Sequence, residues 1–375
     1  MKWERVRLGD VTDSCLGKML DQRKNRGEYQ PYLANVNVRW GSFDLADLSL
    51  MRFEEDEQER YGLKYGDLVI CEGGEPGRCA IWKEQIPNMK IQKALHRVRV
   101  HECLDYRFLF YWFLLAGHRD ALGQYFTGAT IKHMPGDKLK SILIDKPPLE
   151  VQRHIADILS AYDDLIENNQ KQIKLLEEAA QRLYKEWFVD LRFPGHETAK
   201  IVDGVPEGWR KVSVTDLLEI KYGKDHKSLD DGNIPVYGSG GLMRKVKPVL
   251  YSGESVLIPR KGSLNNILYV TGDFWTIDTM FYSVPRAANI VKYSYLFLSG
   301  LDMYSYNIGA AVPSMTVKIL DGIKMLQPQA EILDQFEDKI TPLFERMDTL
   351  KKQSEVAQQA RDRLLPKLMS GELEV

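Results

Sequence analysis

The chain has 375 residues, 44% of them hydrophobic, which is enough to bury the cores of two or three globular domains. It has no run of eighteen apolar residues and no signal-peptide pattern at its start, so we expect a cytoplasmic protein without a membrane partner. The formal net charge of −2 excludes a strongly basic protein, although residues 1–150 and 191–328 have small basic excesses and therefore permit nucleic-acid binding.

Residues 1–150 predict a mixed, strand-rich domain. Short β-branched or aromatic runs such as 67–71 and 95–100 alternate with Gly-rich turns, and one helix is expected at 106–115. The Gly-rich stretch 72–78 lacks the pattern of a P-loop. It is either a plain turn or a loop presented to phosphates. The four cysteines have no C-x-x-C spacing, so neither a zinc site nor a disulfide framework is predicted.

Residues 151–190 predict one long amphipathic helix. The segment follows Pro147-Pro148, contains no glycine and has apolar residues at a 4-3 spacing, which is typical of a coiled-coil seam. A helix of about 40 residues reaches about 60 Å and needs a partner along its apolar stripe. The residues expected to pair are Val151, Ile155, Ile158, Tyr162, Leu165, Leu176 and Leu183, flanked by Leu159, Ile166, Ile173 and Trp187.

A linker is expected at 191–208, followed by a second strand-rich domain at 209–328 with one helix near 293–301. A second long helix then begins after Pro328, and its seam consists of Ile332, Phe336, Leu343, Leu350 and Leu364. Each helix could pack on its own domain. Because a domain of about 130 residues offers a face well under 60 Å, we expect instead that the two helices pair antiparallel.

The sequence contains an internal duplication. Trp3 matches Trp209 near the two starts, Tyr106 matches Tyr293 in the middle, and one register then runs without a gap from Tyr125/Tyr306 to Leu183/Leu364. A period this long indicates duplicated domains and not a solenoid. The offset falls from 206 to 181, which places about 25 extra residues in the first copy, mostly between Lys18 and Gly66.

Several motifs resemble one known family. The string Ala156 to Asn169 (ADILSAYDDLIENN) is similar to the central conserved region of type I restriction-modification specificity subunits. The segments 183–195 and 206–209, the ending 364–373 and the paired segments 128–134 and 309–315 are also typical of that family. Together they cover both helices and much of both globular halves.

The resemblance implies an α+β fold with a pseudo-twofold internal duplication. Two target-recognition domains, 1–150 and 209–328, would each read one half of an asymmetric bipartite DNA site. The helices 151–190 and 329–375 would form an antiparallel coiled coil that measures the spacer. Two methyltransferase subunits would dock on this frame and flip the target bases, and restriction (translocase and nuclease) subunits would bind through them. The chain itself would be non-catalytic, without cofactor or metal, and S-adenosylmethionine, ATP and Mg²⁺ would be bound by the partners.

Loop residues are the candidates for contact with double-stranded DNA, because Arg can fork onto guanine and Lys mostly binds phosphate. For each of them an ordinary solvated side chain is the alternative. The candidates are Arg23, Lys24, Arg39, Trp40, Arg78, Thr130, Lys132 and His133 in the first domain, and Lys224, His226, Lys227, Arg244, Lys245, Arg260, Lys261 and Ser314 in the second.

Three other classes of protein are weighed against this hypothesis. A methyltransferase would need an Asn-Pro-Pro-Tyr-like strip, and Pro147-Pro148 does not fit it. A metal nuclease could use Asp203 with Glu219 and Lys221, but a bare spacing does not specify such a site. A pure coiled-coil adaptor explains the helices and not the duplicated domains. A specificity subunit of a related type II-like methyltransferase/nuclease stays open as an alternative.

Overall fold

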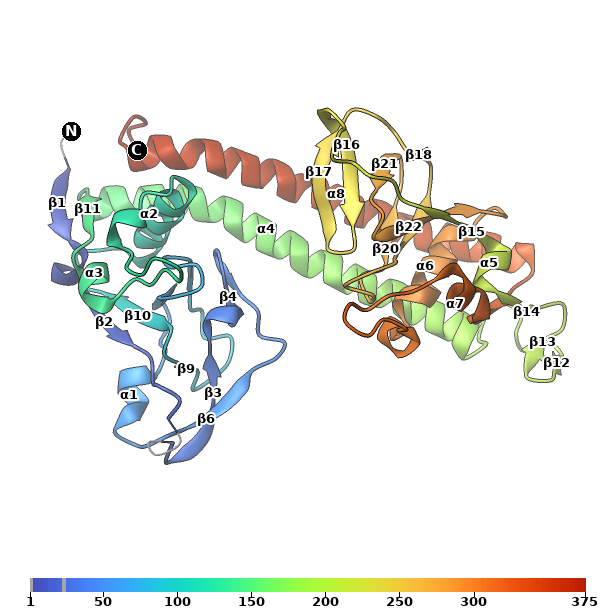
Figure 1. The fold of residues 1–375 in the computed structure, drawn as a ribbon, viewed down its shortest axis with the longest axis horizontal. Helices are drawn as coiled ribbons and strands as arrows, with labels where there is room; N and C mark the ends of the chain where they lie inside the picture. Colours follow the sequence, from blue (N-terminus) through green and yellow to red (C-terminus); the bar gives the residue numbers. More distant parts are fainter. Residues whose placement is uncertain (1–2, 22–24) are drawn as a thin grey trace. The chain divides into compact units, whose positions relative to one another are not determined.

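The computed structural model describes residues 3–21 and 25–375 (Figure 1). Two compact units make up the chain: residues 1–168 with 353–375, and residues 169–352. The long helix α4 (Leu149–Tyr184) runs from the first unit into the second, and α8 (Ala330–Met369) runs from the second into the first. Each unit therefore contains a globular part and a portion of both long helices.

The core of the first unit is a four-stranded antiparallel sheet with the order β2-β10-β7-β8. The helix α2 (Tyr106–His118) packs on this sheet through a fully buried side that includes Phe108, Leu109 and Phe113. Besides α2, the strands and helices of the globular part, including the four strands of this sheet, are β1 (Glu4–Arg7), β2 (Thr12–Leu16), β3 (Glu28–Leu33), β4 (Val38–Arg39), β5 (Ser42–Phe43), β6 (Ser49–Phe53), α1 (Glu57–Tyr61), β7 (Leu68–Cys71), β8 (Cys79–Ile81), β9 (Lys90–Ile91), β10 (Leu95–Val100), α3 (Gly136–Lys140) and β11 (Leu143–Lys146).

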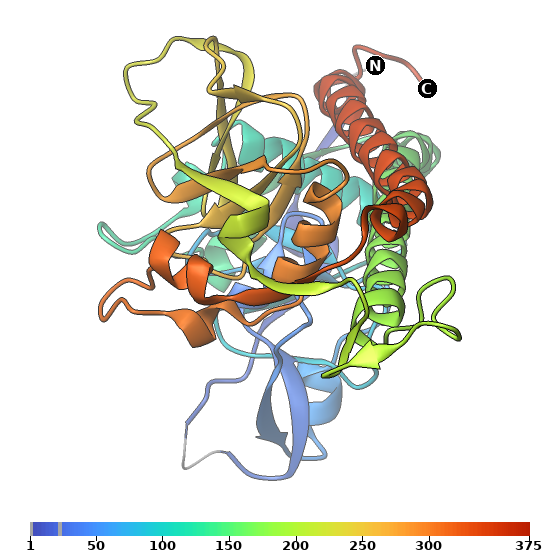
Figure 2. The ribbon, with the colours of Figure 1, turned by 90° about the vertical axis from the view of Figure 1, so that its right-hand side faces the viewer.

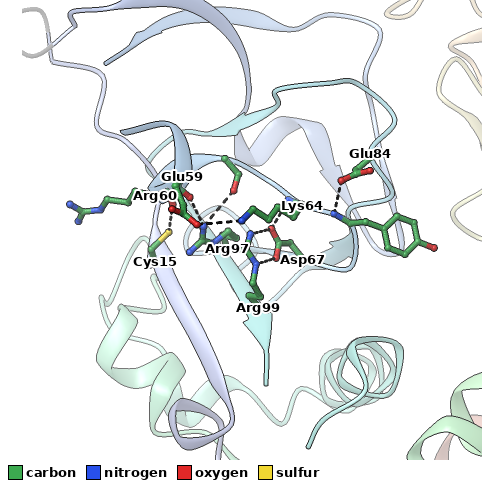
Figure 3. A network of polar contacts seen from close by, with 10 residues as sticks. Cys15, Glu59, Arg60, Lys64, Asp67, Glu84, Arg97 and Arg99 are labelled. Atoms are coloured by element: carbon green, nitrogen blue, oxygen red, sulfur yellow. Dashed lines mark hydrogen bonds and ion pairs between the residues drawn. The ribbon is translucent and has the colours of Figure 1, made fainter. Parts of the chain in front are cut away.

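A polar network ties the sheet of the first unit to the segment that leads into it (Figure 3). The buried carboxylate of Asp67 accepts two hydrogen bonds from the guanidinium of Arg99, at 2.8 and 2.7 Å, and a third from the backbone N–H of Lys64 at 2.7 Å. Arg97 donates to the carbonyl oxygen of Glu59 at 2.9 Å. Because buried charges are stable only when paired and hydrogen-bonded, these contacts fix how β7 enters the sheet.

The second unit repeats this plan, with a four-stranded sheet in the order β15-β22-β19-β20 and a second sheet in the order β17-β16-β21-β18. Figure 2 looks onto this unit, whose helix α6 lies beside the long helices. The elements are β12 (Ile201–Val202), β13 (Val205–Pro206), β14 (Arg210–Ser213), α5 (Val214–Leu217), β15 (Leu218–Tyr222), β16 (Asp231–Gly238), β17 (Gly241–Val246), β18 (Tyr251–Ser252), β19 (Ser255–Pro259), β20 (Leu268–Val270), β21 (Asp273–Thr276), β22 (Met280–Pro285), α6 (Val291–Ser299), α7 (Val317–Gly322) and β23 (Lys324–Gln327).

Strand pairing confirms the internal duplication. In the first unit β1 pairs with β11 and β3 pairs in parallel with β9; in the second, β14 pairs with β23 and β16 pairs in parallel with β21. Among the described elements, β4, β5 and α1 of the first unit have no counterpart in the second. All three lie between Lys18 and Gly66, where the sequence offset places the extra residues.

The two long helices pair antiparallel within each unit. In the first, Ile155 and Leu159 near the start of α4 share a core with Leu365 and Leu368 near the end of α8. In the second, Tyr184 at the end of α4 lies 6.5 Å, centroid to centroid, from Phe336 near the start of α8. The α-helical part of α4 is followed by a π-helical turn, Lys185–Val189, which directs both Trp187 and Phe188 into the core. The predicted coiled coil is thus confirmed.

The seam of α4 differs from the expected one at two positions. Ile158 and Leu165 are 36% and 44% exposed, and the next residues, the buried Leu159 and the half-buried Ile166, face inward instead. In both cases, Ile158 with Leu159 and Leu165 with Ile166, the neighbouring residues are both apolar, so the spacing alone does not show which one faces inward. The apolar stripe of α4 is also widened because this helix packs on α2. Of the other expected seam residues, Ile155, Ile332, Phe336 and Leu350 are buried, and Val151, Tyr162, Leu176, Leu183, Leu343 and Leu364 are half-buried.

Candidate nucleic-acid interface

Three segments of the second unit are fastened together at Gly262. They are the tip of the β16–β17 hairpin from residue 238 to 243, the loop 260–267 after β19, and the loop 307–316 before α7; we call them the second loop surface. The N–H of Gly262 donates to the carbonyl oxygen of Pro313 at 2.9 Å, and Asn266 donates to the carbonyl oxygen of Ser239 at 2.8 Å. Gly262 has φ +90°, and a Cβ there would lie 2.9 Å from Ser239 Oγ, so this junction requires glycine.

The candidate residues of the second unit fall into two groups. Lys224, Lys227, Lys245 and Lys261 are exposed, and within the part of the chain that the structure describes no carboxylate lies within 4.0 Å of their amino groups. The two arginines are engaged by other groups of the chain. Arg244 pairs with Asp231 at 2.6 Å, and Arg260 donates to the carbonyl oxygen of Asp278 at 3.2 Å and lies 5.4 Å above the ring of Tyr222. His226 and Ser314 are half-buried, and Ser314 forms a β-bridge with Lys261.

The first unit has an equivalent arrangement, the first loop surface, made of residues 35–41, 72–78 and 127–134. Gly73 forms a β-bridge with His133, as Lys261 does with Ser314 in the second unit. The indole N–H of Trp40 donates to Glu75 at 2.9 Å, and the same carboxylate accepts from Arg78 at 2.8 Å. The side chain of Arg78 is only 18% exposed and also donates to the carbonyl oxygen of Asn35, so it holds the loop in place.

His96 supports the first loop surface from below. It is buried, and its Nε2 donates to the carbonyl oxygen of Met134 at 2.9 Å. Burial lowers the pKa of this histidine, which favours the neutral ring. On the surface itself Thr130, Lys132 and His133 are exposed, whereas Arg39 lies 3.5 Å from the carboxylate of Asp44. The candidates Arg23 and Lys24 lie outside the described residues.

A pocket of about 560 Å³ opens in the first loop surface. Its lining includes Trp40, Glu75, Gly117, Phe126 and Lys132. Among the described residues no group of His, Cys, Asp and Glu side chains could hold a metal ion. Nor does any described helix have the length and apolarity to cross a membrane.

Exposed apolar residues on these loops were not among the sequence candidates. They are Val36 and Ile131 on the first surface and Leu242, Met243, Ile308 and Val312 on the second, each more than half exposed. Sequence reasoning selected charged side chains, because an apolar residue most often belongs to a core. The sequence did contain one signal for Leu242 and Met243. These two apolar residues follow each other directly after the turn Gly238 to Gly241, in a segment that is otherwise mixed in character.

Comparisons with known proteins agree on one family. The family described as type I restriction modification DNA specificity domain matches residues 1–178 and 206–357. Two similar relatives come from Methanocaldococcus jannaschii. The MjaIX specificity subunit is 28% identical over 72% of this chain and 69% of its own length, and the MjaVIII specificity subunit is 24% identical over 100% and 93%. A crystal structure of the S subunit of the type I restriction-modification system from M. genitalium covers 98% of this chain and 96% of its own, with a TM-score of 0.60 at 20% identity.

The structural likeness gives the fold, and the family match places the chain in the class of non-catalytic DNA-specificity proteins. The two matched regions cover most of the chain, and it therefore belongs to the type I restriction modification DNA specificity domain family. Its role is that of a specificity subunit.

Proposed function

We propose that the chain reads an asymmetric, two-part DNA site, with one half-site bound by each loop surface. The observation that carries the proposal is the duplication: each globular part brings three segments to one surface and joins two of them by an equivalent β-bridge, Gly73 to His133 and Lys261 to Ser314. The side chains on the two surfaces differ. Trp40 and Glu75 belong to the first, and Leu242, Met243 and Lys261 to the second. Unlike surfaces favour unlike half-sites.

The partners and cofactors form the second part of the proposal. Since catalysis in this class lies outside the specificity chain, methyltransferase and restriction subunits would supply it, and two copies of the methyltransferase would fit two equivalent halves. S-adenosylmethionine, ATP and Mg²⁺ would be bound by those subunits. Because the ligand would be genomic DNA, we also propose a cytoplasmic site of action.

Domain exchange tests the two-reader proposal. Residues 1–150 are replaced by the equivalent domain of a relative that has a different target, and methylation of the host genome is mapped. Each globular part has its own core, so one half-site is expected to change while the other half-site stays the same. A simultaneous change of both half-sites would contradict independent readers. The reciprocal exchange of residues 209–328 is the matched control and should alter the other half-site alone.

A further inference from the structure

We infer that the tip of the β16–β17 hairpin reads thymine through Leu242 and Met243, which contact thymine methyl groups in the major groove of the second half-site. The inference rests on the proposed function and names a specificity-determining element within it. None of the charged residues considered above explains why two large apolar side chains, 56% and 53% exposed, stand side by side on this hairpin.

An irregularity in the hairpin produces this pair. Val236 lies opposite Arg244, but the next residue, Tyr237, lies opposite Leu242, so Met243 is an extra residue on β17. A β-bulge of this kind redirects a side chain that regular alternation would place on the other face. Gly238 leaves the space that Met243 uses, because a Cβ there would lie 2.6 Å from the Met243 sulfur. The two apolar side chains can therefore both reach the surface.

The backbone beneath these side chains is held from two directions. On one side β16 pairs in parallel with β21, with Val236 opposite Trp275. At the turn, Asn266 donates to the carbonyl oxygen of Ser239, and Gly262 packs against the side chain of the same serine. An exposed element that is already ordered loses little conformational entropy when it binds a partner. The hairpin tip is thus preorganised for contact.

Duplex DNA is the partner that fits the surroundings of the tip. A two-stranded ribbon has the width that the major groove admits. Lys261 lies on the second loop surface, and Lys245 follows Met243 by two residues on β17. Both side chains are exposed and, within the described residues, have no carboxylate within 4.0 Å of their amino groups, so they can bind phosphates. Thymine is the one base that presents an apolar group, its C5-methyl, in that groove. An apolar core in a protein–protein contact would instead be depleted of charged neighbours.

The test removes one methyl group at a time from the DNA. The full-length protein, bound to its methyltransferase partner, is titrated with a duplex that carries the motif returned by methylation mapping. Each thymine of the second half-site is replaced in turn by deoxyuridine, which differs only by the missing methyl. At one or two positions we expect binding to weaken about fourfold, the effect of exposing one buried methylene-sized group.

Variants of the protein then assign the effect to the hairpin. Leu242→Ala and Met243→Ala are each expected to weaken binding to the thymine duplex and to abolish the difference between thymine and deoxyuridine at one position. The control is Val249→Ala, 44% exposed and beyond the other end of β17, which should keep the full difference. Substituting these exposed side chains leaves the core beneath the hairpin, which includes Val236 and Val246, unchanged.

Two results would overturn the inference. One is a second half-site without any position sensitive to deoxyuridine, and the other is a sensitivity that persists unchanged in both hairpin variants. Inosine–cytosine pairs present the same minor-groove edge as adenine–thymine pairs and a different major-groove edge. Binding that stays unchanged when they replace adenine–thymine pairs, together with no response to deoxyuridine, would indicate the minor groove and would also refute the inference. With any of these results, the wild-type complex would still bind a duplex with its motif more tightly than a duplex without it. Loss of that preference in the wild-type complex would refute the proposed function itself, so the two failures are distinguishable.

Discussion

At the scale of single residues, the environment of a cation decides whether it can bind phosphate. Lys261 and Arg260 are neighbours, yet only Lys261 is exposed; the guanidinium of Arg260 is used by Asp278 and by the ring of Tyr222. Arg78 and Arg244 are likewise held by carboxylates of their own chain. Such residues shape the loops, and the lysines beside them remain available to DNA.

We therefore expect Lys261→Ala to weaken DNA binding and to make its salt dependence shallower. Loss of one phosphate contact reduces the slope of log K against log salt by about 0.9. Fluorescence anisotropy of the complex between 50 and about 200 mM salt measures this slope. Lys247→Ala is the matched control, because Lys247 already lies 3.5 Å from Asp230. If Lys261→Ala left the slope at the wild-type value, Lys261 would be an ordinary solvated side chain without a phosphate contact.

Residue type in a loop was predictable from the sequence, and residue environment was not. The Gly-rich stretch 72–78 could be recognised as a loop, and Lys261 as a loop residue. The ion pairs of Arg78 with Glu75 and of Arg244 with Asp231 depend on backbone turns and register that no spacing rule gives. Met243 was missed for the same reason, since its exposure comes from a β-bulge.

At the scale of elements, the helix pair joins its two globular domains by different chemistry. In the first unit Tyr111 of α2 donates to Asp163 of α4 at 2.6 Å, and Arg361 of α8 pairs with the same carboxylate. Burial and the neighbouring Asp163 raise the pKa of Tyr111, which keeps its phenol protonated as a donor. At the equivalent positions of the second unit stand Leu298, Phe344 and Ala180, all within one apolar core.

This comparison predicts the effect of substitutions in the first unit. Arg361→Ala leaves Asp163 partly buried with its ion-pair partner removed and should lower the free energy of unfolding by about 3 kcal/mol. The triple variant Tyr111→Leu, Asp163→Phe, Arg361→Ala copies the second unit and should recover most of that loss, because a well-packed apolar cluster can replace a buried ion pair. Urea unfolding followed by circular dichroism compares the variants. If the triple variant were less stable than Arg361→Ala alone, apolar packing could not substitute for the polar group.

The existence and pairing of the two long helices could be predicted because period, length and proline positions all agreed. The exact seam could not. Ile158 and Leu159 are both apolar, and only the positions of α2 and α8 decide that Leu159 is buried while Ile158 is not. The π-helical turn at Lys185–Val189 shifts the register after Tyr184, and the heptad pattern contains no sign of it.

At the scale of the whole molecule, both long helices contribute one portion to each unit. The Asp163 to Arg361 pair belongs to the first unit, and the hydrogen bonds of Asn169 with Leu350 and of Gln172 with Arg346 belong to the second. The boundary crosses α4 between residues 168 and 169 and α8 between 352 and 353. Residues inserted at both points would leave the packing inside each unit intact.

The last prediction uses these two points to test whether the helices measure the DNA spacer. One heptad inserted at both keeps the seam in phase and lengthens the helix pair by about 10 Å. At about 3.4 Å per base pair, the spacer in the methylated motif should grow by about three pairs while both half-sites stay unchanged. Three pairs also turn the second half-site by about a third of a helical turn, so we expect reduced activity.

The control for this experiment is an insertion that does not keep the apolar seam in phase. A two-residue insertion at the same points rotates the apolar stripe away from its partner and should reduce both stability and methylation more than the heptad does. Methylation mapping of the host genome reads out spacer and half-sites together. An active heptad variant with its original spacer would show that the distance between half-sites is set by something other than these helices, and the coiled coil would then be a scaffold without a measuring role.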